Sequence, residues 1–155
     1  MSQKKPMDDR FKRFGTVSFT AVTKVNDFVD YLEKGKVMGT RCGSCGLVFF
    51  PPRADCFRCL SSSMEWFEVK GPGTLITYSR LSYAPAGFEE DVPYCLAILD
   101  YGAYKVFGRV DSDIPEEELR PGMEMVTVAK RLPDGQLTYV FTKPGKRFIV
   151  KEEDS

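Results

Sequence analysis

Two close pairs of cysteines most constrain what this chain can fold into. Cys42 is paired with Cys45 and Cys56 with Cys59, and ten residues separate the two pairs. A gap of two residues lets both sulfur atoms of a pair turn toward one ion, and two such pairs are typical of a tetrahedral metal site. Thiolates favour zinc or iron over hard cations that prefer oxygen ligands. We therefore predict a metal site on these four thiols and expect Zn²⁺ there, with iron as the open alternative.

The other interpretation is that the four cysteines are buried thiols or disulfides. Chance rarely produces two such pairs, and nothing near the N-terminus reads as a secretory signal. In a reducing compartment, paired cysteines are more often metal ligands than disulfides. Four thiolates leave no coordination position for water, so we expect the metal to hold structure and to do no chemistry.

Composition limits the classes of function. The chain of 155 residues carries 22 Lys and Arg against 22 Asp and Glu, which argues against a protein that mainly neutralises nucleic-acid phosphates. No apolar run is long enough to span a bilayer, so we expect no membrane partner and a cytoplasmic protein. Histidine, the commonest general base, is absent. The remaining cysteine, Cys95, lies within a predicted strand, and we expect it in the core.

The N-terminal half is expected to be an arm, a helix and a metal ribbon. Residues 1–22 are predicted to be a mobile arm, and residues 23–35 an amphipathic helix whose apolar face includes Phe28 and Leu32. That face could pack on the chain's own core or dock another protein. Residues 36–63 are predicted to form a zinc ribbon, in which an apolar segment before Pro51 links the cysteine pairs.

The C-terminal half predicts a five-stranded barrel over residues 64–147, followed by an acidic tail over residues 148–155. The expected strands are Trp66–Leu81, Tyr94–Asp100, Tyr104–Val110, Met123–Arg131 and Leu137–Thr142. A short helical turn between the third and fourth strands is the order of an OB-fold. The fold class is therefore mainly β, with an N-terminal helix, a rubredoxin-like zinc ribbon and an OB-fold barrel.

Six short motifs carry a resemblance to a known family. They are Gly35–Gly46, Phe50–Arg53, Cys56–Cys59, Gly71–Leu75, Val92–Tyr94 and Arg120–Met123. The first three resemble the rubredoxin-like zinc-ribbon half of a family long catalogued as a domain of unknown function. The other three resemble the acyl-CoA-associated OB-fold that its members join to that ribbon. The resemblance covers about Thr23 to Arg147.

The resemblance implies a function that composition cannot show. Members of the family are typically small partners of thiolase-like enzymes, and others join acyl-CoA hydratases or the thiolase for benzoylsuccinyl-CoA. The large partner carries the catalytic residues. The chain is thus expected to be a non-catalytic accessory subunit of an acyl-CoA-processing hetero-oligomer, with CoA or acyl-CoA as a shared ligand. The missing histidine agrees with this, since generating the CoA thiolate needs a base.

Two groups of residues are expected to serve this function. Partner docking is predicted for Phe28, Leu32, Phe49 and Phe50. A border of the CoA path is predicted for Arg41, Arg53, Tyr83 and Phe88, although the arginines could simply neutralise the thiolates. The rival functions are a single-stranded nucleic-acid-binding module, an electron carrier with iron on the four thiolates, and a stand-alone CoA-binding protein.

Overall fold

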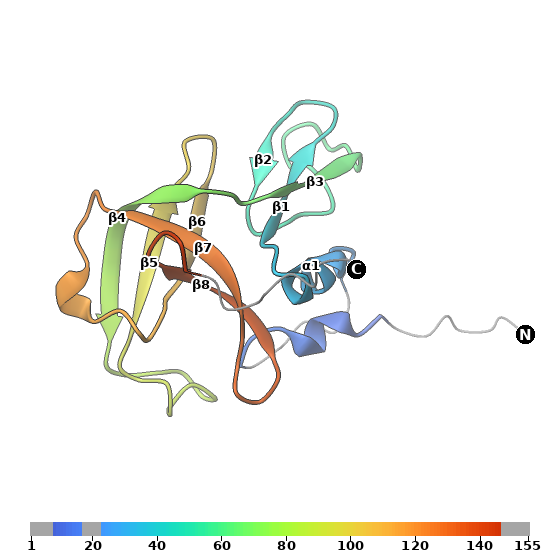
Figure 1. Cartoon of the computed structure of the whole chain (residues 1–155). Helices are drawn as coiled ribbons and strands as arrows, with labels where there is room; N and C mark the ends of the chain where they lie inside the picture. Colours follow the sequence, from blue (N-terminus) through green and yellow to red (C-terminus); the bar gives the residue numbers. More distant parts are fainter. Residues whose placement is uncertain (1–7, 17–22, 147–155) are drawn as a thin grey trace, which may run out of the picture.

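The chain folds into a small sheet and a closed barrel, with one α-helix beside them (Figure 1). The computed structural model describes residues 8–16 and 23–146. The small sheet has the order β2-β1-β3, from β1 (Met38–Cys42), β2 (Val48–Phe49) and β3 (Met64–Glu68). The barrel has the order β4-β5-β6-β8-β7, from β4 (Pro72–Leu81), β5 (Tyr94–Asp100), β6 (Lys105–Val110), β7 (Glu124–Arg131) and β8 (Leu137–Thr142). The helical segments are η1 (Arg10–Arg13), α1 (Asp27–Glu33) and η2 (Glu116–Glu118).

The barrel confirms the predicted OB-fold. Its strands alternate in burial, so that Leu75, Leu99, Val106 and Met125 point inward with at most 1% of their surface exposed. The turn η2 lies between β6 and β7, where the sequence predicted a short helix. All neighbouring strands are antiparallel except β6 and β8, whose short parallel pairing closes the barrel.

The predicted long strand Trp66–Leu81 is in fact two strands in different sheets. β3 pairs along its whole length with β1, from Met38 opposite Glu68 to Cys42 opposite Met64, and so it belongs to the ribbon sheet. The chain then turns at Gly71, whose φ of 75° favours glycine, and β4 begins the barrel. Alternation of side chains looks the same in both strands, so the sequence pattern could not separate them.

Helix α1 is shorter than the predicted helix over 23–35 because the preceding residues form a turn. The side-chain amide of Asn26 donates to the Thr23 carbonyl oxygen at 2.6 Å, and the Val25 N–H donates to the Thr23 hydroxyl oxygen at 3.3 Å. Thr23 therefore supports the approach to the helix and does not cap its first turn. None of the helices among the described residues is long and apolar enough to cross a membrane.

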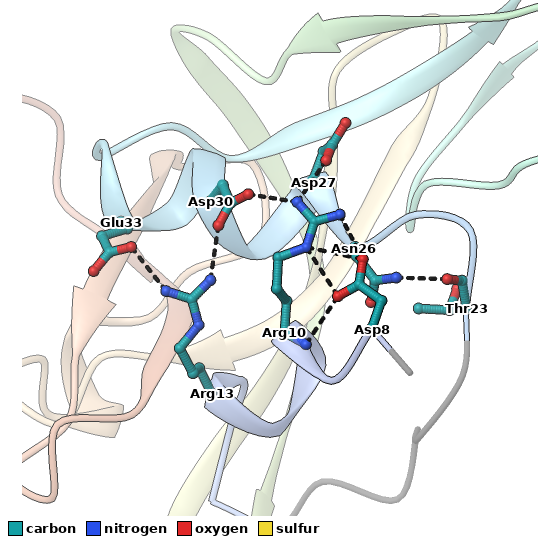
Figure 2. Close-up of polar contacts among 8 residues, drawn as sticks. All are labelled: Asp8, Arg10, Arg13, Thr23, Asn26, Asp27, Asp30 and Glu33. Atoms are coloured by element: carbon teal, nitrogen blue, oxygen red, sulfur yellow. Dashed lines mark hydrogen bonds and ion pairs between the residues drawn. The ribbon is translucent and has the colours of Figure 1, made fainter. Parts of the chain in front are cut away.

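Residues 8–16, predicted to be part of a mobile arm, lie against α1. Arg10 donates hydrogen bonds to Asp27 and Asp30 of the helix at 2.7 and 2.5 Å, and Arg13 donates to Asp30 and Glu33 (Figure 2). The side chains in these ion pairs are about half-exposed, so each pair adds little stability by itself.

The apolar side of the same segment makes the connection to the barrel. The ring of Phe14 packs edge-to-face on Phe28 of α1, with ring centres 5.6 Å apart. The Gly15 N–H donates to the Leu137 carbonyl oxygen at 2.6 Å, next to a bridge between Phe14 and Leu137. Residues 8–16 thus tie α1 to β8. The rest of the predicted arm, at 1–7 and 17–22, and the predicted tail at 148–155 lie outside the described residues.

Candidate functional site

The four cysteines of the two pairs come together at one end of the ribbon sheet. Their Sγ atoms all lie within 4.8 Å of one another, with separations of 3.4 Å between Cys42 and Cys59 and 3.5 Å between Cys45 and Cys56. An ion with Zn–S bonds of about 2.3 Å in a tetrahedron would hold its sulfur ligands about 3.8 Å apart. The cluster therefore has the size and the donor chemistry of a four-thiolate zinc site, and the predicted grouping of the cysteines is confirmed.

The two cysteine turns, residues 42–46 and 56–60, share one backbone arrangement. The Gly46 N–H donates to the Cys42 carbonyl oxygen at 2.9 Å, and the Leu60 N–H donates to the Cys56 carbonyl oxygen at the same distance. Both turns end in a left-handed residue, with φ of 77° at Gly46 and 63° at Leu60. This conformation directs the next N–H groups toward sulfur, a contact that favours the thiolate form. In the second turn the Ser61 N–H lowers the pKa of Cys59, but the neighbouring cysteine side chains and burial outweigh it, so the net shift raises that pKa.

Hydrogen bonds to sulfur prepare the first turn for a metal ion. The Leu47 N–H, together with the nearby Arg58 guanidinium, lowers the pKa of Cys45 to about 6. The Cys45 N–H lies 3.4 Å from the Cys42 sulfur and lowers the pKa of Cys42 in the same way. Since the thiolate is the form that binds metal, these contacts increase the fraction of each cysteine that is ready to coordinate at neutral pH.

Arg53 is held beside the metal cluster by Thr40 of β1. The buried Thr40 hydroxyl accepts the Arg53 N–H at 2.8 Å and donates to the Arg53 carbonyl oxygen at 3.0 Å. The guanidinium then lies over the rings of Phe49 and Phe57, 5.6 and 5.5 Å from their centres. Within the described residues it forms no ion pair with an acid, so its charge is available to a ligand.

A groove of about 410 Å³ lies between the ribbon and the β5–β6 turn. Among residues 8–16 and 23–146, Arg53 and Lys105 are the only charged side chains in its lining. The rest of the lining is apolar or aromatic and consists of Val48, Phe49, Phe50, Pro51, Pro52, Phe57 and Tyr104. The volume is in the range of small-molecule sites, and the chemistry suits a ligand that combines a flat or apolar part with an anionic group.

The four residues predicted to border the CoA path lie in two separate parts of the structure. Arg53 lines the groove, and Arg41 lies outside its lining, exposed on β1 with its guanidinium over the Phe67 ring. Tyr83 and Phe88 belong to the loop between β4 and β5, at the lower end of the barrel in Figure 1, whereas the ribbon is at the top. A strand the length of β5 spans roughly 20 Å, which keeps the two ends of the barrel apart.

The predicted docking residues belong mainly to the chain's own core. Phe28, Leu32 and Phe49 expose 3%, 0% and 7% of their surface, and Phe50 is half-buried in the groove lining. Helical periodicity shows that one face of a helix is buried, but it cannot show whether the covering surface is the same chain or another. Partner docking through these side chains stays a prediction, which the burial of Phe28, Leu32 and Phe49 within the chain does not support.

Sequence reasoning missed Lys105, Tyr104, Phe57 and Leu60. The first two lie about fifty residues after the cysteines, and no local pattern connects them to the ribbon. Phe57 and Leu60 did carry a signal, because they are large apolar residues in a tight metal-binding turn, where little core is within reach. In the structure they expose 64% and 82% of their surface.

Comparison with known proteins agrees with this architecture. Residues 30–65 match the family described as ChsH2, rubredoxin-like zinc ribbon domain, and residues 66–130 match ChsH2, C-terminal OB-fold domain. A DUF35 domain-containing scaffold protein of Methanocaldococcus jannaschii is 35% identical over 114 residues, which are 69% of this chain and 79% of that protein. One from Pyrococcus furiosus is 32% identical over 129 residues, or 79% of this chain and 90% of that protein.

Two solved structures share the fold. One, described as Ltp2-ChsH2(DUF35) aldolase, has a TM-score of 0.65 at 20% identity and covers 84% of this chain and 99% of that chain. A DUF35 protein of unknown function from Sulfolobus solfataricus has a TM-score of 0.53 at 17% identity, over 86% and 90% of the two chains. With its four-cysteine ribbon, its closed barrel and its relatives, this chain belongs to the DUF35 family of proteins with a rubredoxin-like zinc ribbon and an OB-fold.

Proposed function

We propose that this chain is a non-catalytic, zinc-binding accessory subunit of an acyl-CoA-processing complex with a thiolase-family partner. The observation that carries the proposal is its similarity, over more than two thirds of its length, to proteins named as scaffolds. A neighbour in fold is described as an Ltp2-ChsH2(DUF35) aldolase, a name that joins a DUF35 protein to a second component. The four-thiolate cluster supports a structural and not a chemical role for the metal, because it leaves no open coordination position.

The side chains of this chain support a non-catalytic role. The sequence has no histidine to act as a general base. Cys95 is the one cysteine outside the cluster, and burial raises the pKa of its thiol. A nucleophilic cysteine needs the opposite shift, toward the thiolate. The chemistry of the complex would therefore come from the partner.

The test of this proposal is to purify the tagged full-length chain from its source organism and to identify what co-elutes. A thiolase-family protein in fixed ratio, with about one zinc per small chain, is the expected result. A chain that elutes alone, or with nucleic acid, would contradict the proposal. A red, reducible fraction containing iron would favour the electron carrier instead.

We propose further that the groove between the ribbon and the β5–β6 turn receives the nucleotide end of CoA. Arg53 and Lys105 are positioned for phosphate groups, and Phe57 and Tyr104 offer faces or edges to an adenine ring. The proposal retains Arg53 from the residues that the sequence singled out. It replaces Tyr83 and Phe88, which lie at the other end of the barrel.

Replacing Arg53 with glutamine is expected to weaken CoA binding by the intact complex about tenfold or more, because a charge-assisted hydrogen bond to phosphate is lost. Isothermal titration calorimetry with CoA measures the change. Arg80→Gln is the matched control, since Arg80 lies on the barrel and pairs with Glu116 at 3.3 Å. Equal CoA affinity in the wild type and in Arg53→Gln would rule out CoA binding in this groove. It would not contradict the proposed role as an accessory subunit.

A further inference from the structure

Leu60 has a backbone conformation and an exposure that the fold does not explain. It is the one non-glycine residue with positive φ among residues 8–16 and 23–146, and 82% of its surface is exposed. A left-handed conformation costs free energy for a residue with a Cβ atom, and a branched side chain has no local hydrogen bond to offset the cost. Such strain persists where the surrounding structure imposes it, and it often marks a functional position.

The first cysteine turn shows what the backbone alone requires. Gly46 occupies the position that Leu60 occupies in the second turn, with the same N–H bond back to the first cysteine of the pair. Glycine therefore meets the geometric requirement without strain. Leu60 is not part of either hydrophobic core cluster, so packing within the chain gives no reason for a leucine.

A second exposed apolar side chain lies in the same turn. Phe57 exposes 64% of its surface, although its ring contacts Phe49 edge-to-face with centres 5.4 Å apart. Two cations flank this tip: Arg53 lies over the Phe57 ring, and Arg58 donates to the Cys45 carbonyl oxygen at 3.0 Å. Arg53 forms no ion pair with an acid in the part of the chain that the structure describes, whereas Arg58 lies beside the cysteine cluster and helps to lower the pKa of Cys45.

We infer that Phe57 and Leu60 form the docking tip of this chain for the thiolase-family subunit. This rests on the proposed function and names the surface that carries it. The complementary surface on the partner is an apolar pocket with a carboxylate opposite Arg53, because the tip offers two exposed apolar side chains beside a guanidinium that has no acidic partner among the described residues. Phe57 also lines the groove, so a subunit seated on the tip would cover the open side of the groove.

The metal cluster explains how so small a tip can be rigid. Cys56 and Cys59 bracket Phe57, and Leu60 directly follows Cys59, so coordination of both sulfur atoms would fix the intervening backbone. Pre-organisation of this kind reduces the ordering cost of binding. It also explains why a strained residue is tolerated, since the turn is held from both sides.

The experiment compares Leu60→Asn and Phe57→Ala with the wild-type chain. Asparagine accepts the left-handed conformation while removing the apolar side chain. The thiolase-family protein that co-purifies with the wild-type chain serves as the probe, and its affinity is measured by calorimetry beside zinc content and Tm. We expect both variants to keep zinc and to bind about 30-fold or more weakly, as for a central anchor residue. Leu60→Asn should not lower Tm.

Phe107→Ala is the matched control, because Phe107 exposes 58% of its surface on barrel strand β6, outside the tip. It should bind the partner as the wild type does. Leu60→Asn with full zinc and unchanged affinity would overturn the inference, and so would a loss of zinc or of Tm, which would give Leu60 a structural role. If no thiolase-family protein binds the wild type, the proposed function fails first and the docking inference fails with it.

Discussion

Replacing Cys42 with serine is expected to abolish tight zinc binding, to unfold the ribbon sheet and to release the partner subunit. Cys42 ends β1, the central strand of that sheet, and only 1% of its surface is exposed. In zinc-finger peptides the bound metal contributes on the order of 10 kcal/mol to folding, so a ribbon of this size depends on its metal. The measurements are zinc content, amide exchange of residues 38–68 and co-elution with the partner.

Cys95→Ser provides the control for this prediction. It makes the same chemical change at a half-buried thiol on β5, outside the four-cysteine cluster. This variant should keep its zinc, the ribbon and the partner. A strong chelator should reproduce the effect of Cys42→Ser on the wild-type chain. If Cys42→Ser assembles normally without metal, the ribbon does not depend on zinc, and the structural role assigned to the cluster is wrong.

Replacing Asp111 with alanine is expected to destabilise the barrel by about 3 kcal/mol, which corresponds to a Tm roughly 6–12 °C lower. The Asp111 side chain is 0% exposed, and its carboxylate lies 2.6 Å from the Lys130 ammonium and 3.7 Å from that of Lys146. Removing the carboxylate leaves the half-buried ammonium of Lys130 without this counter-charge. The expected loss of stability is at the lower end of the range for broken buried ion pairs because Lys130 and Lys146 can turn toward solvent.

The position of Asp111 explains why this loss should affect the whole barrel. The residue directly follows β6, and its N–H donates to the Phe141 carbonyl oxygen of β8 at 2.8 Å. It therefore extends the short parallel pairing that closes the barrel. Chemical denaturation of the zinc-loaded full chain measures the effect.

Asp113→Ala is the control for the buried carboxylate. Asp113 pairs with Lys146 at 2.7 Å, but its side chain is 61% exposed. Because surface ion pairs contribute little, this variant should unfold close to the wild-type midpoint. Equal midpoints for Asp111→Ala and Asp113→Ala would show that burial of the Asp111 pair does not stabilise the barrel.

Much of the architecture could be predicted from the sequence because its signals are local. The two-residue gap in each cysteine pair is enough to bring two sulfur atoms to one ion. Because the sequence contains two such pairs, it predicted the four-cysteine cluster. The barrel strands were predicted from alternation and from turn residues between neighbours, and the position of η2 identified the OB-fold. These patterns do not depend on the rest of the chain.

Pairings between distant segments were not predictable in this way. The assignment of β3 to the ribbon depends on hydrogen bonds with β1, about 26 residues away in the sequence. The groove depends on the fold bringing Arg53 and Lys105 into one lining, although they are distant in the sequence. The apolar face around Phe28 was visible in the sequence, but what covers it was not.

The sequence by itself thus determined the grouping of the four cysteines, the positions of most barrel strands and the family. The tertiary structure decided which residues share a surface: the β4–β5 loop that contains Tyr83 lies at the end of the barrel away from the ribbon, and Phe57 and Leu60 are exposed on the second turn. The physical reason is that side-chain type and spacing act over a few residues, whereas exposure and proximity result from packing of the whole chain.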